Sequence, residues 1–211
     1  MVDKMKYYIY VSDTKVEMLY SQIPRHLRET VATELKIDLK FLSTTFSEDP
    51  TQETRYSKLE IVTKNIERSS VIGTVDKPGT YFQGTMRLRW GPFEPFNEMI
   101  YFGGRTAHTI LGLAGSTQHL ISRIGSSEFS MGISEAPNIL RVLLTLDNPE
   151  KDASETSIDD DELGLVAKAT GLMKGPEQRL EFLAKRLIEG YARKENARIV
   201  LGSPIYVALA E

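Results

Sequence analysis

The first third of the chain alternates short apolar runs with stretches of helical spacing. Residues 7–11 form an aromatic and β-branched run that predicts a first strand. Apolar residues then recur with helical spacing up to Pro24 and again after it, which predicts two consecutive helices. Residues 37–41 alternate between apolar and polar positions and predict a second strand, whereas residues 57–66 carry one apolar helical face. This part of the chain therefore predicts a βαβα order.

The middle of the chain changes from helical to strand periodicity. From residue 81 to 90, apolar and polar side chains alternate, which is typical of a strand with one buried face. Residues 99–102 and 109–113 predict two further strands, with a glycine-rich turn at 103–105 between them. Residues 91–97 predict the loop that joins the first pair of strands. Three strands in series with short connections predict an antiparallel meander.

After the meander, helical and acidic segments follow one another. Pro137 is well suited to begin a helix that runs to Leu144. Residues 147–161 are rich in acids, Ser and Thr and carry few large apolar side chains, so we expect a mobile acidic loop. A helix is predicted next, over residues 162–172.

The last part of the chain predicts one more helix and a return to the sheet. Residues 176–190 have an apolar helical face, made by Leu180, Leu183, Ala184, Leu187 and Ile188. Residues 198–201 and 205–209 predict a closing strand pair or one interrupted strand. The predicted fold is α/β (α+β) and forms a single domain over residues 1–211. It has a mixed sheet with an N-terminal βαβα portion, an antiparallel meander, and C-terminal helices before a final strand.

Composition narrows the classes of function. Hydrophobic residues make up 41% of the 211 positions, enough for a sizeable core. The absence of cysteine excludes disulfides, a cysteine nucleophile and thiolate metal sites, and it suits a cytoplasmic location. No apolar segment has the length of a membrane span, so we expect no membrane association. The net charge of −3 makes nucleic acid an unexpected partner. Three scattered histidines predict no metal site, and no cofactor motif is present.

Several motifs resemble those of one bacterial family. The N-terminal motif YYxYxSDxKVxML spans Tyr7 to Leu19, and a second motif, GLxGSxxH, spans Gly112 to His119. Together with Gly73–Asp76 and Leu201–Val207, they resemble a family of bacterial proteins, frequent in actinobacteria, that has no assigned activity. The resemblance extends over nearly the whole chain and implies one domain. It also implies a setting beside bacterial defence or signalling genes.

The glycine-rich segment is the first candidate site. Gly103 and Gly104 allow close backbone approach and could form an anion-binding nest of N–H groups, beside which Arg105 could clamp a phosphate or carboxylate. The alternative is that these glycines serve only turns or a bulge in the meander.

Ser116 and His119 are weak catalytic candidates. At this spacing the two side chains could meet on one helical turn, and His119 could act as a base if Asp13 or Asp76 orients it. The alternative is that Ser116 is the N-cap of a helix that contains His119.

Two further groups are candidate ligand-binding residues. Strand alternation sends Arg87 and Arg89 to one face, where they form a cationic strip or a solvated outer face. Ser12, Asp13 and Lys15 follow the first strand, where α/β proteins often bind ligands, although Asp13 could be only a helix cap.

These observations favour a non-catalytic, sensor-like protein that binds a nucleotide-like or other anionic small molecule. The expected pocket has Ser12, Asp13 and Lys15 on one side and the arginines with the glycine-rich turn on the other. One alternative is a hydrolase or phosphodiesterase that acts on a small phosphorylated substrate. The other is an interaction module or homo-oligomer that docks through the helix at 176–190 or through Phe93 and Phe96.

Overall fold

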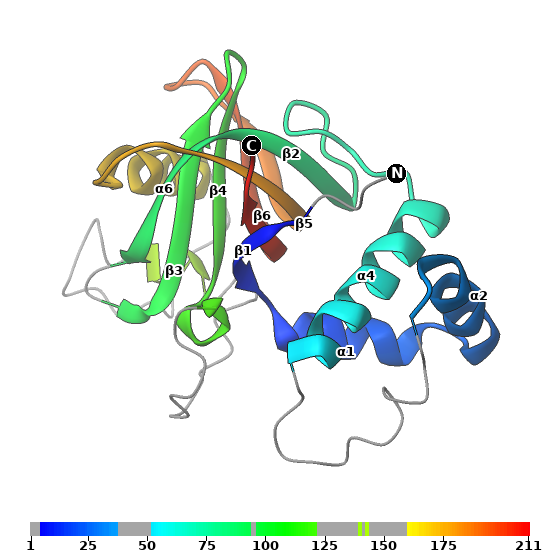
Figure 1. The fold of residues 1–211 in the computed structure, drawn as a ribbon. Helices are drawn as coiled ribbons and strands as arrows, with labels where there is room; N and C mark the ends of the chain where they lie inside the picture. Colours follow the sequence, from blue (N-terminus) through cyan, green and yellow to red (C-terminus); the bar gives the residue numbers. More distant parts are fainter. Residues whose placement is uncertain (1–4, 38–51, 94–95, 122–138, 141, 144–159) are drawn as a thin grey trace. The chain divides into compact units, whose positions relative to one another are not determined.

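The computed structural model describes residues 5–37, 52–93, 96–121, 139–140, 142–143 and 160–211 (Figure 1). The chain divides into two compact units. Residues 12–72 form the helical unit, and residues 1–11 with 73–211 form the barrel unit. In the part that is described, no helix has the length and apolar character needed to cross a membrane.

The barrel unit contains the predicted meander. Strands β2 (Tyr81–Phe93), β3 (Phe96–Arg105) and β4 (Thr109–Ser116) pair in series and antiparallel, which confirms the prediction. Each strand is longer than the segment that the sequence pattern predicted. The predicted loop at 91–97 belongs largely to β2 and β3, and the predicted turn at 103–105 lies inside β3. Both corrections follow from cross-strand pairing, which holds Gly and Pro residues in extended backbone despite their turn preference.

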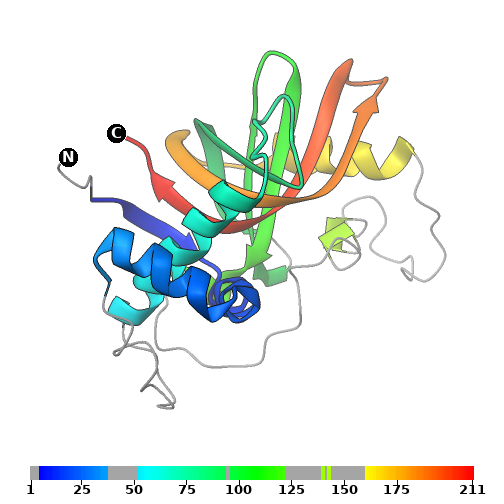
Figure 2. The same ribbon diagram turned by 90° about the vertical axis from the view of Figure 1, so that its right-hand side faces the viewer.

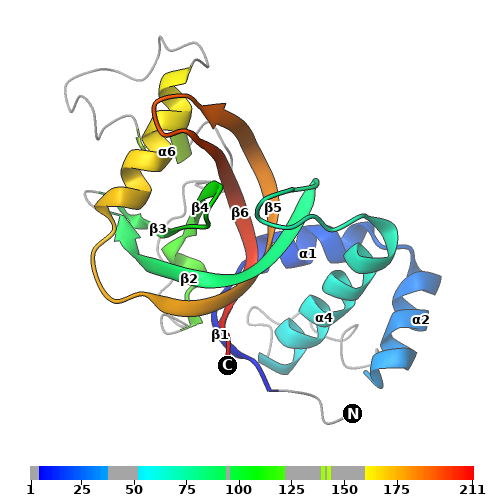
Figure 3. The same cartoon turned by 90° about the horizontal axis from the view of Figure 1, so that it is seen from above.

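Two C-terminal strands close the meander into a ring. Strand β6 (Ala197–Leu209) runs parallel to β4, and β5 (Gln178–Ala192) is antiparallel to both β6 and β2. The ring order is therefore β2-β3-β4-β6-β5, and Figure 3 shows the barrel from above. Strand β1 (Tyr7–Val11) pairs with the C-terminal half of β6. The sequence predicted a mixed sheet, which is confirmed, but not its closure.

The strand order and the position of one helix define the connectivity of the barrel. The five ring strands form a closed Greek-key barrel with a helix between the third and the fourth of them in chain order. The helix is α6 (Asp160–Leu172), which packs against β4, β5, β3 and β6. The outer core under α6 leaves exposed positions on the first half of β2, at the C-terminal end of β3 and at the N-terminal end of β5.

Each face of the barrel wall packs into its own apolar core. The interior is filled by side chains from all five ring strands, among them Phe82, Phe102, Leu113, Phe182 and Val200. Five strands enclose a space that these side chains fill, as expected for so small a barrel. The second core lies outside the wall, where α6 and residues 139, 140, 142 and 143 pack against apolar side chains of β3, β4 and β6, together with Phe93 of β2 and Ala192 of β5. The described residues 139, 140, 142 and 143 are helical, in agreement with the predicted helix at 137–144.

The largest error of the sequence prediction concerns residues 176–190. They form β5 and not a helix, and β5 runs beside β6 up to the hairpin that joins the two strands (Figure 2). The segment carries two apolar periodicities at once. Leu180, Phe182 and Ala184 alternate as in a strand and point into the barrel, although Leu180 and Ala184 also fit the helical pattern. Pairing with two strands overrides the helical propensity of the segment.

Strand β6 is continuous. Of the two predicted arrangements, a strand pair or one interrupted strand, the single strand is therefore closer to the structure. Pro204 lies in its middle, where the pairing with β5 shifts register between Leu183 and Ala184. A bulge is a position at which a strand tolerates the missing N–H of proline.

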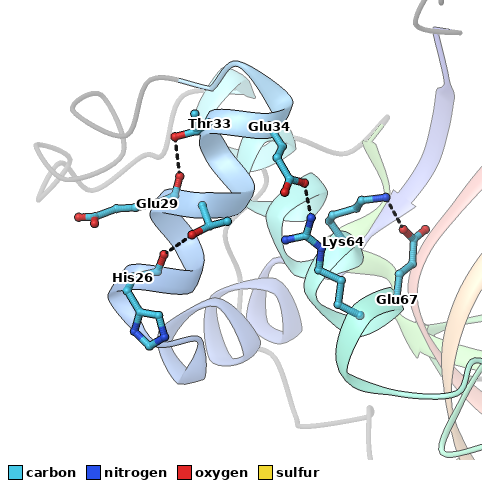
Figure 4. Close-up of polar contacts among 8 residues, drawn as sticks. His26, Glu29, Thr33, Glu34, Lys64 and Glu67 are labelled. Atoms are coloured by element: carbon cyan, nitrogen blue, oxygen red, sulfur yellow. Dashed lines mark hydrogen bonds and ion pairs between the residues drawn. The ribbon is translucent and has the colours of Figure 1, made fainter.

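The helical unit contains α1 (Asp13–Gln22), α2 (Arg25–Leu35) and α4 (Gln52–Ser69), which confirms the helices predicted there. Both α1 and α2 pack against α4. In one polar contact between these helices, the Arg68 guanidinium of α4 donates to Glu34 of α2, and within α4 Lys64 pairs with Glu67 at 3.1 Å (Figure 4). The predicted strand at 37–41 and most of the acidic loop at 147–161 lie outside the described residues. The βαβα order therefore stays a prediction.

We expect Phe182→Ala to destabilise the protein strongly. A helix would leave Phe182 off its apolar face, whereas β5 buries it in the barrel against Phe82, with ring centroids 5.8 Å apart. Truncation of a buried phenylalanine costs about 3–5 kcal/mol of unfolding free energy. Chemical denaturation measures this value. Lys185→Ala, at an exposed position of the same strand, is the control and should change the free energy by less than about 0.5 kcal/mol. Equal effects of the two substitutions would contradict the strand.

Candidate anion-binding site

Arg87 and Arg89 lie on the outer face of β2, as the alternation predicted. Phe82 and Leu88 of the same strand point into the barrel, so the odd-numbered positions point outwards. Both arginine side chains are exposed. Arg89 pairs with Glu177 across 3.3 Å, and this carboxylate neutralises it in part.

Strand register sets two more arginines beside Arg87. The pairing of β2 with β3 ends where Arg89 faces Gly103, and Arg87 and Arg105 each lie two residues beyond this last pair. The strands stay close there, since a Cβ at Gly104 would lie 2.6 Å from the Arg87 carbonyl oxygen, so Arg105 lies beside Arg87. On its other side β2 pairs with β5, and there Arg87 faces Arg179 directly. The three arginines therefore occupy one line across β3, β2 and β5. We call Arg105, Arg87 and Arg179 the arginine row.

Arg179 belongs to the arginine row but was not among the predicted site residues. A helix at 176–190 gives no reason to set it beside Arg87, and only the pairing of β5 with β2 does so. Arg179 is exposed, whereas its neighbours Gln178 and Leu180 point inwards. This alternation between the two faces is typical of a strand and could have identified Arg179 as an outward residue.

The arginine row has no acidic partner among the described residues. All three side chains are exposed, and none of them forms an ion pair within the part of the chain that the structure describes. The nearby carboxylates are engaged elsewhere: Glu177 pairs with Arg89 at 3.3 Å, and Glu181 with Lys6 at 2.8 Å. Like charges directly opposite each other on neighbouring strands are destabilising. The row therefore carries an electrostatic cost that no described contact offsets.

Gly103 and Gly104 lie within β3 and make room for close packing. A Cβ at Gly104 would lie 2.6 Å from the Arg87 carbonyl oxygen, and one at Gly103 would lie 3.1 Å from Cα of Thr170 on α6. The described residues with positive φ are Lys36, Asn196 and Gly175, and neither of these two glycines is among them. The backbone at Gly103 and Gly104 is thus extended, and the geometry here gives them a packing role.

The turn between β3 and β4 lies further along, at residues 106–108. There the Thr106 hydroxyl donates to Asp76 at 2.7 Å and accepts from the backbone N–H of His108 and Thr109. The hydrogen bond from Thr106 is the main reason that the pKa of Asp76 lies below its ordinary value. Asp76 therefore fixes this turn.

Ser116 and His119 lie on one short turn, a 3₁₀ helix at Thr117–His119 (η1). The Ser116 hydroxyl accepts from the backbone N–H of Gln118 at 3.3 Å, which is the capping role given above as the alternative. The His119 ring packs edge-on against Tyr10, with centroids 5.9 Å apart. Asp76 lies beyond the opposite end of β4, about 25 Å away along an eight-residue strand. It cannot orient His119.

The residues that follow β1 form their own contacts within the helical unit. Asp13 lies in the first turn of α1, where Arg55 of α4 approaches both carboxylate oxygens, at 2.7 and 2.6 Å. Ser12 is fully buried, and its hydroxyl accepts from the Lys15 ammonium at 3.3 Å. Burial lowers the pKa of Lys15 to about 8. These three residues belong to the helical unit, whereas the arginine row belongs to the barrel unit.

Two expectations for an interaction module are wrong. The segment at 176–190 is a strand of the barrel and not a surface helix. Phe93 is buried, not exposed, and packs against Tyr101 with ring centroids 5.5 Å apart. The side chain of Phe96 lies outside the described residues.

Fold and site together define a mixed α and β protein whose closed barrel carries a line of arginines on its open face. The chain belongs to a family of unknown function, DUF7019, whose model matches residues 6–211. This confirms the resemblance to a family without an assigned activity. No curated protein and no solved structure matches the chain. Within the described residues, no group of His, Asp and Glu side chains could hold a metal ion.

We expect Gly112→Ala to destabilise the barrel unit. Its new Cβ would lie 2.2 Å from the Tyr101 hydroxyl and 3.0 Å from Val166 on α6, and Tyr101 is fully buried. Overpacking of this kind costs about 1–3 kcal/mol. The matched control is Gly164→Ala in α6, where nothing lies within 4 Å of the new Cβ and helix propensity adds about 0.5–1 kcal/mol of stability. Urea denaturation of both variants checks the opposite signs.

Burial of Lys15 predicts a pH-dependent contribution to stability. Its pKa is about 8 in the folded chain and near 10.5 when exposed, so the unfolded chain binds more protons between these values. The free energy of unfolding contributed by Lys15 must therefore increase as the pH rises from about 8 to about 10. We expect wild type to gain stability relative to Lys15→Met over this interval, measured by denaturation at a series of pH values. A constant difference between the two proteins would contradict the buried position.

Proposed function

We propose that this protein is a non-catalytic ligand-binding protein that recognises a nucleotide-like or other anionic small molecule through the arginine row. The observation that carries the proposal is the alignment of Arg105, Arg87 and Arg179 on neighbouring strands without an acidic partner among the described residues. Guanidinium groups bind phosphate and carboxylate in paired hydrogen bonds. An anionic ligand would remove the mutual repulsion of the row.

We also propose a regulatory, sensor-like role in the cytoplasm. The cysteine-free chain suits a reducing compartment, and a sensor needs only reversible binding. A role in bacterial defence or signalling is supported by the family resemblance alone.

A hydrolase is the less favoured alternative. Catalysis through Ser116 and His119 requires a carboxylate that orients the imidazole. Of the two predicted carboxylates, Asp13 pairs with Arg55 and Asp76 accepts a hydrogen bond from Thr106. The Ser116 hydroxyl accepts a backbone hydrogen bond as a helix cap.

We expect nucleotides or phosphorylated metabolites to raise the unfolding temperature in a thermal-shift screen. A ligand at a hundred times its Kd adds about 2.7 kcal/mol, which corresponds to about 5–10 °C for a protein of this size. Arg87→Gln should remove most of the shift. Arg193→Gln, an exposed arginine just beyond the other end of β5, makes the same charge change and should keep it. A screen without any shift, or equal shifts in both variants, would overturn the proposal.

A further inference from the structure

The shape of the arginine row limits what it can bind. Adjacent strands lie about 4.8 Å apart, so the Cα atoms of Arg105 and Arg179 are about 10 Å apart, with Arg87 midway. The three charges lie along a line across the strands, whereas a site for a single phosphate concentrates its donors around one point. A linear ligand can give each guanidinium its own phosphate oxygens.

Acidic residues limit the row along the strand direction. On β5 and just before it, Glu177 and Glu181 lie two positions to either side of Arg179. A long polyanion that ran along the strands would meet both carboxylates. A short chain of phosphates that crosses the strands meets only the arginines.

The described outward residues next to the arginine row include no aromatic ring on which a nucleobase could stack. The nearest outward positions on β2 and β5 are Thr85, Arg89 and Glu181, none of them aromatic. The aromatic side chains of β2 and β5 nearest the row point inwards: Trp90 stacks on Phe102 at 5.8 Å, and Phe82 packs on Phe182. The outward Tyr81 lies six positions from Arg87, about 20 Å along β2, and the exposed Tyr191 lies at the other end of β5 from Arg179. Proteins that bind single-stranded nucleic acid stack bases on exposed aromatic rings. Among the described residues, the immediate neighbours of the arginine row thus offer contacts for phosphates and none for stacked bases.

We infer that the arginine row binds a short linear polyphosphate, as in a nucleoside triphosphate, and recognises the phosphate chain without reading the base. This inference rests on the proposed function, since it specifies the anion that the same face takes. It distinguishes the ligand from single phosphates and from nucleic acid.

Titration calorimetry with orthophosphate, pyrophosphate and tripolyphosphate, in the absence of divalent cations, tests the inference. We expect affinity to rise with each added phosphate, by about tenfold or more per guanidinium engaged, since hydrogen bonds to charged groups are strong. ATP, GTP, CTP and UTP should bind as tripolyphosphate does. Arg87→Gln, Arg105→Gln and Arg179→Gln should each weaken tripolyphosphate binding by a similar factor, whereas Arg193→Gln should not.

Stability of the variants separates a binding role from a structural one. Because the row is repulsive, each of the three row variants should unfold at the same temperature as wild type or higher when no ligand is present. A row that stabilised the fold would give lower unfolding temperatures in these variants, and that result would count against the inference.

The other possible binding results separate a failure of the polyphosphate inference from a failure of the proposed function. If orthophosphate binds as tightly as tripolyphosphate, or if affinity depends on the base, the polyphosphate inference is overturned while anion binding stands. If an oligodeoxythymidylate binds more tightly than tripolyphosphate, the ligand is a nucleic acid and the inference is again wrong. If the nucleotides and metabolites of the thermal-shift screen and the three phosphates all fail to bind, the proposed function fails with it.

Discussion

The double pairing of β5 is the constraint on which the barrel and its candidate site both depend. One edge of β5 bonds to β2 and the other to β6, and only this closes the ring. Closure fixes the direction of every side chain on β5, because successive residues of a strand alternate between faces. Phe182 then points into the barrel, and Arg179 points outwards beside Arg87. The register of β5 therefore determines both the packing of the barrel interior and the place of Arg179 in the arginine row.

The glycine-rich segment serves the second apolar core. Gly103 faces Gly112 across β3 and β4, and together they leave room for Tyr101 and α6 against the barrel wall. The Tyr101 hydroxyl lies within hydrogen-bonding distance of Thr170 at 3.0 Å, and burial raises the pKa of this phenol. The close approach of α6 covers the outer face of β3 and β4. Arg105 at the end of β3, Arg87 on β2 and Arg179 at the start of β5 lie outside this core and stay exposed.

Local pattern predicted those elements whose sequence carries a single periodicity. The helices α1, α2, α4 and α6 and the three strands of the meander follow from it, because each has one apolar spacing only. Residues 178–192 carry two, and the choice between them depends on pairing with strands far away in the sequence. Arg87 and Arg89 could be predicted as one outer strip from alternation on β2 alone. Arg179 could not, since its place beside Arg87 exists only in the closed barrel.

Several charged side chains elsewhere in the described chain have ion-pair partners, whereas the three neighbouring arginines of the row have none there. On the same strand β5, Glu189 contacts both Arg186 and Arg198, so two cations share one carboxylate. In the helical unit, Asp13, Glu17 and Glu34 each pair with a cation from α4. Sequences that specify one structure satisfy local rules throughout, and the exceptions gather at functional sites. Three adjacent arginines without a described counter-charge are such an exception. Under the proposed function, a bound anion would supply the counter-charge that no described residue gives the arginine row.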